Sequence, residues 1–151
     1  MSVTRVAALA AVLFVFTAQT PMSVPAYEVD PSWPRPLPNH WIVGAVVGVA
    51  VDSQDHIWIT HRPSTLQPNE TRSFWRAAPP VLEFDQQGNL VSSWGGPGAG
   101  YEWPQLEHGI FVDDRDHVWL GGGGEKDAQI LEFKCSEYVE EFFWGEYRRV
   151  R

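Results

Sequence analysis

The stretch Gly109–Gly121 reads GIFVDDRDHVWLG, and the chain contains the same pattern earlier, at Gly48–Thr60, as GVAVDSQDHIWIT. An offset of 61 residues superimposes the two copies, and three aliphatic positions keep their character. Tandem self-similarity over such a length is typical of repeat architectures. The identical pairs are Gly48/Gly109, Val51/Val112, Asp52/Asp113, Asp55/Asp116, His56/His117 and Trp58/Trp119.

Each copy has the alternation of β-strands. Apolar residues recur at every second position before and after a short polar turn, which places them on one face of a strand. Two further strand patterns follow, joined by a glycine-containing hairpin signal, and no segment after residue 30 sustains a helical stripe. Four short antiparallel strands per unit are typical of a propeller blade. The predicted strands of the first unit are Val47–Val51, Ile57–Thr60, Val81–Asp85 and Asn89–Trp94.

The repeat continues downstream, since Leu82–Phe84 returns as Leu131–Phe133 and Trp94 as Trp144. Together with the glycine-rich run WGGPGAGYEWPQLEHGIFVD, these segments resemble the NHL repeats of six-bladed β-propellers over roughly Val46–Trp144. Within that family the chain is most similar to bacterial proteins that resemble peptidyl-hydroxyglycine amidating lyases. The resemblance implies an all-β fold: a partial NHL-type propeller of about two four-stranded antiparallel blades.

The first 26 residues have the pattern of a signal peptide. Arg5 precedes an apolar run of 13 residues, Val6–Ala18, and small residues follow at Val24–Ala26. The run is shorter than the roughly 20 residues that span a bilayer. We therefore expect a secreted or periplasmic protein, with an uncleaved N-terminal membrane anchor as the alternative.

Removal of residues 1–26 takes away one base and no acid, so the net charge changes from −8 to −9. This balance argues against nucleic acid or an anionic membrane as the partner. The single cysteine, Cys135, has no partner for an internal disulfide. No serine-histidine-aspartate order, HExxH, CxxC or P-loop pattern supports a hydrolase or a nucleotide site.

The predicted organisation follows from these patterns. A proline-rich lead-in at 27–45 precedes a first blade at 46–95, a linker at 96–108 and a second blade at 109–145. The tail at 146–151 lacks the glycine-rich linker expected after a blade. Two blades leave exposed faces, so we predict either a truncated reading of a longer protein or self-association, in which three chains complete a ring of six blades.

An inserted loop at 61–80 interrupts the first blade. Trp58 and Phe84 are 26 positions apart, whereas their counterparts Trp119 and Phe133 are 14 apart. Long loops on rigid scaffolds frequently carry binding function; a loop that merely covers the blade is the alternative. The candidate residues for binding a protein or peptide-like ligand are Arg62, Arg72, Phe74, Trp75 and Arg76.

The resemblance also implies a zinc ligand at His108, just before the glycine that opens an inner strand. His61, at the end of a strand beside the inserted loop, is the second candidate. A catalytic zinc needs about three protein ligands, which this chain does not clearly provide. The repeated His56 and His117 occur in both copies, which favours a structural role.

Two functions remain open at this point. The first is a binding or interaction scaffold. The second is a zinc-dependent lyase that cleaves a peptidyl-hydroxyglycine-like substrate to an amide and glyoxylate, with the metal polarising the substrate hydroxyl and the site incomplete in this chain.

Overall fold

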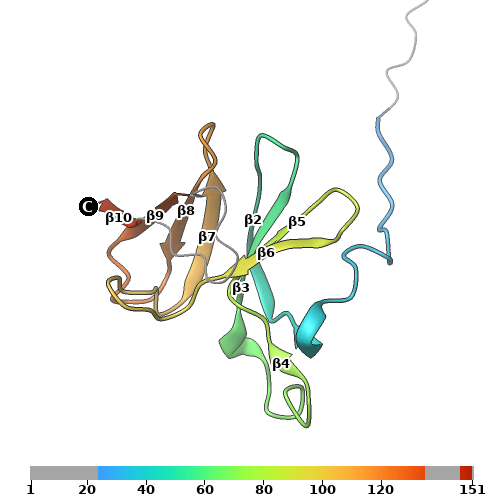
Figure 1. Ribbon diagram of the computed structural model, residues 1–151, viewed down its shortest axis with the longest axis horizontal. Coiled ribbons are helices and arrows are strands. Elements are labelled where there is room, and N and C mark those ends of the chain that lie inside the picture. The colour runs from blue at the N-terminus through green and yellow to red at the C-terminus, as the bar shows by residue number, and fades with distance from the viewer. Residues whose placement is uncertain (1–23, 135–146, 151) are drawn as a thin grey trace, which may run out of the picture.

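The computed structural model describes residues 24–134 and 147–150. Within these ranges the regular structure consists of β-strands and two short 3-10 turns, η1 (Pro38–His40) and η2 (Pro63–Thr65), without an α-helix. Two four-stranded antiparallel sheets stand beside one another (Figure 1), and a parallel pair of short strands forms a third, smaller sheet. The prediction of an all-β chain with four-stranded antiparallel units is confirmed.

The first sheet contains β2 (Ala45–Val51), β3 (Ile57–Arg62), β5 (Val81–Phe84) and β6 (Leu90–Trp94), in that order. Because these strands follow one another in the sheet as they do in the chain, the sheet is a simple meander. All its pairings are antiparallel. The strand positions match those expected from the alternating pattern to within two residues at each end.

The second sheet contains β7 (Glu107–Val112), β8 (His117–Gly122), β9 (Ile130–Lys134) and β10 (Tyr147–Val150), again in chain order. The fourth strand therefore lies in the tail at 146–151, which was expected to fall outside the second blade. The assignment from the Trp94/Trp144 match points to an earlier segment, and residues 135–146 lie outside the described ranges.

The two sheets repeat each other in irregular details as well as in strand order. A register shift occurs between Val46 and Gly48 in the first sheet and between Glu107 and Gly109 in the second, at equivalent positions. Left-handed residues also recur in the turns between the paired strands, at Asp55 (φ 62°) and Asp116 (φ 58°). The two units therefore share backbone conformation as well as sequence.

The main hydrophobic core lies between the two sheets. Strands β2 and β7 lie side by side, and one face of each sheet packs on the other. Burying a large aliphatic or aromatic side chain contributes on the order of 1.5–3 kcal/mol, so each of these residues adds substantially to the stability of the contact. The buried residues of this cluster are Trp58, Val81, Val112, Val118, Leu120, Leu131 and Phe133.

The lead-in covers the β5 side of the opposite face of the first sheet, whereas Val49 and Val51 on β2 are 64% and 56% exposed. Leu82 and Phe84 point to this side and are fully buried, and Trp33 lies against Phe84 with ring centroids 5.5 Å apart. The Arg35 N–H donates to the Gly88 carbonyl at 2.9 Å. A Cβ on Gly88 would lie 2.8 Å from the Trp33 ring, so the glycine permits this close approach.

The inserted loop is tied to the same lead-in. Strand β1 (Trp41–Ile42) pairs in parallel with β4 (Arg76–Ala77), and the Ala78 N–H donates to the Ile42 carbonyl at 2.9 Å. The loop projects below the first sheet in Figure 1, with β4 at its base. Strand β4, at the end of the loop, is thus held to the lead-in by backbone hydrogen bonds.

Among the described residues, no helix has the length and apolar character needed to cross a membrane. Most of the predicted signal peptide, residues 1–23, lies outside the described ranges.

Candidate functional site

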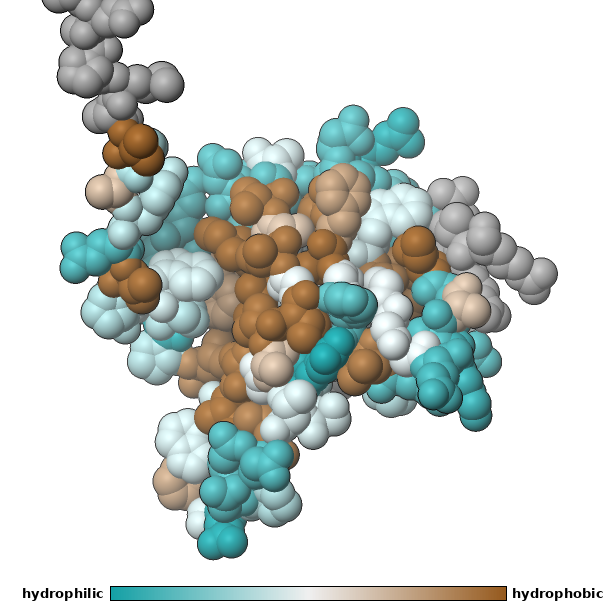
Figure 2. Space-filling model, turned by 180° about the vertical axis from the view of Figure 1, so that it is seen from behind, coloured by the Kyte–Doolittle hydropathy of each residue, from teal (hydrophilic) through white to brown (hydrophobic). Residues whose placement is uncertain are grey.

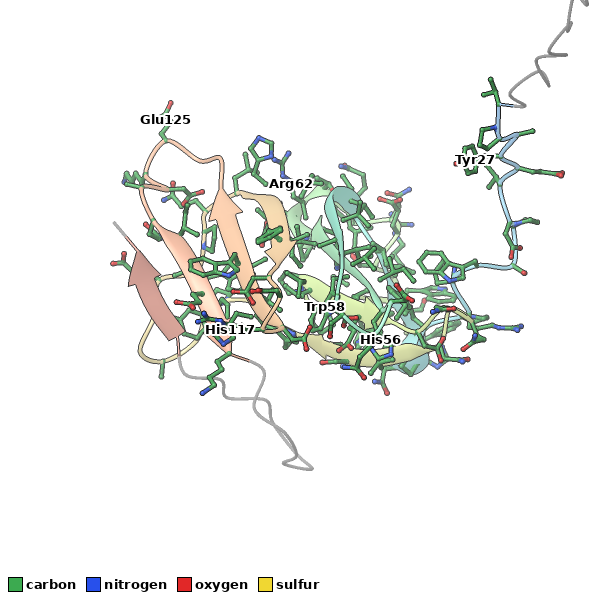
Figure 3. All side chains as sticks on the ribbon, turned by 90° about the horizontal axis from the view of Figure 1, so that it is seen from above. Tyr27, His56, Trp58, Arg62, His117 and Glu125 are labelled. Atoms are coloured by element: carbon green, nitrogen blue, oxygen red, sulfur yellow. The ribbon has the colours of Figure 1, made fainter. Side chains whose placement is uncertain are left out.

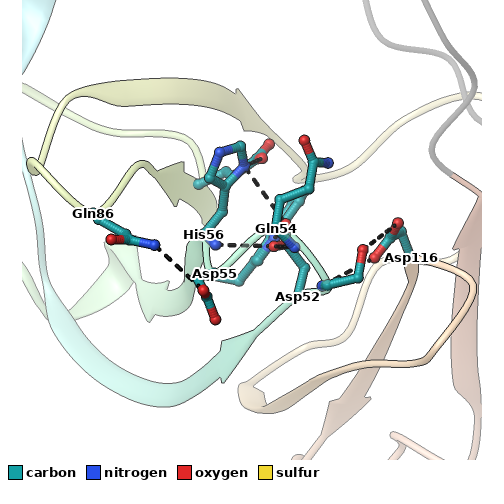
Figure 4. Close-up of polar contacts among 9 residues, drawn as sticks. Asp52, Gln54, Asp55, His56, Gln86 and Asp116 are labelled. Atoms are coloured by element: carbon teal, nitrogen blue, oxygen red, sulfur yellow. Dashed lines mark hydrogen bonds and ion pairs between the residues drawn. The ribbon is translucent and has the colours of Figure 1, made fainter.

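A polar network closes the turn between β2 and β3. Asp52 Oδ1 accepts hydrogen bonds from the backbone N–H groups of Gln54 (2.8 Å) and His56 (2.9 Å). Its other oxygen, Oδ2, accepts the indole N–H of Trp58 at 2.8 Å. Figure 4 shows Asp52 in the turn beside Gln54 and His56. The Asp52 side chain thus accepts hydrogen bonds from backbone N–H groups in the turn that would otherwise have no acceptor within the chain.

The next strand adds a second carboxylate to the network. Glu83 on β5 lies opposite Trp58 in register, and its Oε1 is 2.7 Å from His56 Nδ1. Burial raises the pKa of Glu83, and the hydrogen bond with His56 partly opposes that effect. The histidine therefore links the turn to a strand that follows the inserted loop.

The same network occurs in the second sheet. Asp113 accepts the His117 N–H at 2.9 Å and the Trp119 indole N–H at 3.0 Å, and Glu132 Oε1 is 3.1 Å from His117 Nδ1. Figure 3 shows His56 and His117 on their respective sheets. The geometry supports the structural role expected for the repeated residues. The two glutamates belong to Leu-Glu-Phe segments that recur in the sequence, but no local pattern connects these segments with the turn.

Asp52, His56 and Glu83 also place three ligand-type atoms within 4.8 Å of one another. These atoms already have partners, because Asp52 holds the Trp58 indole and Glu83 holds His56. A cation would have to displace these hydrogen bonds. The arrangement fits a hydrogen-bonded scaffold better than a metal centre.

The zinc candidate on β3, His61, is fully buried and uses both ring nitrogens. Its Nδ1 accepts the Gly44 N–H at 3.1 Å, and its Nε2–H donates to the Pro79 carbonyl at 2.9 Å. Burial lowers the pKa of this imidazole, which is held neutral. His61 therefore joins the lead-in to the end of the inserted loop, and ligation would require the loss of one of these hydrogen bonds.

The other zinc candidate, His108, is exposed on β7 beside Gly123. Neither it nor His61 belongs to the three-residue grouping found among the described residues. Zinc binding at His108 stays a prediction. Arg62, a candidate for ligand binding, donates from Nε to the Glu107 carbonyl at 2.6 Å and thereby connects the two sheets.

The remaining binding candidates lie together on the inserted loop. Phe74 and Trp75 have ring centroids 5.6 Å apart, and the His40 ring meets them edge-on at 4.9 and 5.8 Å. Phe74 is 56% exposed and Trp75 44% exposed, and Arg72 and Arg76 are exposed as well. In Figure 2 the lower projection combines hydrophobic and hydrophilic side chains. We call Arg72, Phe74, Trp75, Arg76 and His40 the loop surface.

The buried imidazole of His61 predicts a pH-dependent stability. At pH values below 6.5, the ordinary pKa of histidine, His61 takes up a proton more readily in the unfolded chain than in the folded protein. The reason is that burial lowers the pKa of His61 in the folded state. The free energy of unfolding should therefore fall as the pH decreases from about 6.5 towards the folded pKa, by up to ~1.4 kcal/mol per pH unit. Urea unfolding of the wild type and of His61→Gln at pH 5 to 8 tests this.

The variant removes the titrating group, so its stability should change less over that range. Glu83 acts in the opposite direction, since its raised pKa makes its contribution decrease as the pH rises above 4.5. It is present in both proteins and cancels in the comparison. If the free energy of unfolding changed equally with pH in the two proteins, the prediction would be contradicted.

Comparison with known proteins gives no family for this chain. No protein-family model matches it. A search of curated proteins also gives no match.

Proposed function

We propose that this chain is an exported NHL-type β-propeller segment that acts as a binding scaffold, with the loop surface as the site for an acidic peptide or an acidic protein segment. Two meander sheets that pack face to face, each with the same turn network, support the repeat interpretation. The sheets supply the rigid base, and the inserted loop supplies the contact residues.

The observation that carries this proposal is the exposed aromatic pair on an anchored loop. Isolated exposed apolar residues are common, but two adjacent aromatic rings at the surface, flanked by cations, are typical of interaction sites. The pairing of Trp41 with Arg76 fixes the base of the loop, which reduces the entropy lost on binding. The arginines favour carboxylate ligands through bidentate hydrogen bonds.

Binding to a panel of short acidic peptides, measured by fluorescence anisotropy, tests the proposal. Trp75→Ala should weaken binding at least tenfold, about 1.4 kcal/mol, because it removes half of the aromatic pair. Phe111→Ala is the matched control, since this residue is also exposed but lies on the second sheet. Failure of every acidic peptide to bind, or equal binding by Trp75→Ala and the wild type, would contradict the proposal.

The zinc-dependent lyase stays a prediction. It requires ligands beyond His108, because the ring nitrogens of His61 are both used within the fold.

A further inference from the structure

The outer face of the second sheet is apolar and uncovered by the described residues. Phe111 and Ile130 are 62% and 49% exposed there, beside the partly exposed Trp119. With Gly109 and Gly121 they line a shallow concavity of about 460 Å³. We call this surface, defined by those five residues, the docking face.

The internal repeat identifies what covers the equivalent face of the first sheet. The counterparts of Trp119 and Ile130 are Trp58 and Val81. They are only 3% and 0% exposed because the second sheet packs on them. The docking face therefore corresponds, in position and composition, to the face of the first sheet that packs on the second sheet.

A pair of glycines provides an independent observation. A Cβ on Gly48 would lie 3.0 Å from the Ile110 backbone nitrogen and 3.1 Å from its Cγ2, so this glycine allows the second sheet to approach closely. A Cβ on its counterpart in the docking face, Gly109, would meet no atom within 4 Å. Gly109 therefore repeats the glycine that lets a neighbouring sheet approach Gly48, but no described residue lies against Gly109.

We propose that the docking face receives a further module of the same repeat, seated as the second sheet is seated on the first. The partner is a four-stranded antiparallel sheet whose contact face carries a Leu-x-Phe strand equivalent to Leu131–Phe133. This inference rests on the repeat and on the packing of the two sheets, and it is independent of the ligand proposed for the loop surface.

The turn at the edge of the docking face specifies the charge of the partner. In the first sheet, Ser53 donates from its N–H (3.3 Å) and its hydroxyl (3.0 Å) to the carboxylate of Asp116 on the second. The counterpart of Ser53 is Asp114, which when ionised cannot donate from its side chain. The partner therefore needs a cation or a donor where the second sheet has Asp116, since two carboxylates would repel.

A second copy of this chain fits the docking face less well. The face that it would have to present contains Leu82 and Phe84, which its own lead-in covers through Trp33. Val49 and Val51 on that face are already 64% and 56% exposed, but the complete seating seen between the two sheets would require the lead-in to leave Leu82 and Phe84. An uncovered module meets no such obstacle, so we assign the face to a module and treat self-association as an outcome of the test.

The test extends the full chain by one module. A second copy of residues 95–151 is appended after Val150, with Lys at the position equivalent to Asp116. Ile130→Cys is introduced in the first copy only, in a Cys135→Ser background. Thiol labelling of Cys at position 130 should be at least tenfold slower in the extended chain than in the unextended one. Val91→Cys, on an edge strand away from this face, is the control and should label equally in both.

Two further measurements make the result decisive. Gly109→Ala in the first copy of the extended chain should abolish most of the protection, while the same change leaves the thermal midpoint of the unextended chain unaltered, because the added methyl meets only the docked module. Asp in place of the appended Lys should reduce the protection.

Equal labelling in extended and unextended chains would overturn the proposal, whether or not circular dichroism shows the appended module to be folded. Protection that rises with concentration in the unextended chain would overturn it as well and assign the face to a second copy.

Discussion

Phe84→Ala is expected to lower the free energy of unfolding by about 3–5 kcal/mol, the usual range for a phenylalanine removed from a core. Phe84 is fully buried on β5 and lies between the first sheet and the lead-in. Its loss leaves a cavity beneath the Trp33 ring, which packs on it at 5.5 Å. The lead-in should therefore detach more readily, in addition to the global loss of stability.

Urea unfolding followed by circular dichroism measures the first effect, and limited proteolysis of the lead-in under native conditions measures the second. Phe111→Ala is the matched control, since its ring is 62% exposed and its removal should change the stability by no more than about 0.5 kcal/mol. If both variants lose similar stability, or if the lead-in of Phe84→Ala resists protease as the wild type does, the packing described for this face is wrong.

Asp52→Asn is expected to cost about 2–4 kcal/mol, although it replaces only one oxygen by an NH₂ group. Both oxygens of Asp52 accept hydrogen bonds, from two backbone N–H groups and from the Trp58 indole. An amide must turn its own NH₂ towards one of these donors. Because the Asp52 side chain is only 3% exposed, the displaced donor cannot be satisfied by water, and losing a hydrogen bond to a buried charge is costly.

Two matched substitutions complete this experiment. Asp113→Asn should have a smaller effect in the same direction, because the second sheet has the same network but the Asp113 side chain is 19% exposed and water can reach a displaced donor. Asp55→Asn should be nearly neutral, within about 0.5 kcal/mol, since Asp55 is exposed and asparagine adopts its left-handed backbone easily. Thermal and urea unfolding of the three variants give the comparison. A neutral Asp52→Asn would show that the carboxylate does not organise the turn.

The strands and their order can be predicted from the sequence because alternation and the repeat are local signals. Val81–Phe84 and Ile57–Arg62 differ from the expected strands by one or two residues. The pairing between strands then follows from short connections. Repetition alone also indicates a structural role for the duplicated aspartate, histidine and tryptophan, and the hydrogen bonds around Asp52 support it.

Other features depend on contacts between distant segments and have no local signal. Glu83 joins His56 only because register places it opposite Trp58. The sequence suggests a ligand contact for Arg62, yet its guanidinium reaches the start of β7. The position of His61 beside a loop suggests a zinc ligand, and only the folded chain reveals that both ring nitrogens are engaged. A strand pattern does not show which residues across a sheet become neighbours.

The turn network of the second sheet has a consequence for how such chains can grow. The hydrogen bonds that join Asp113 to His117 and Trp119, and His117 to Glu132, lie within one module. Positions that differ between the copies, such as Ala50 and Phe111, lie at contacts between modules or on open faces. Duplication of the coding segment therefore yields a unit that already carries its own turn network, while its hydrophobic face still needs a neighbouring sheet to cover it.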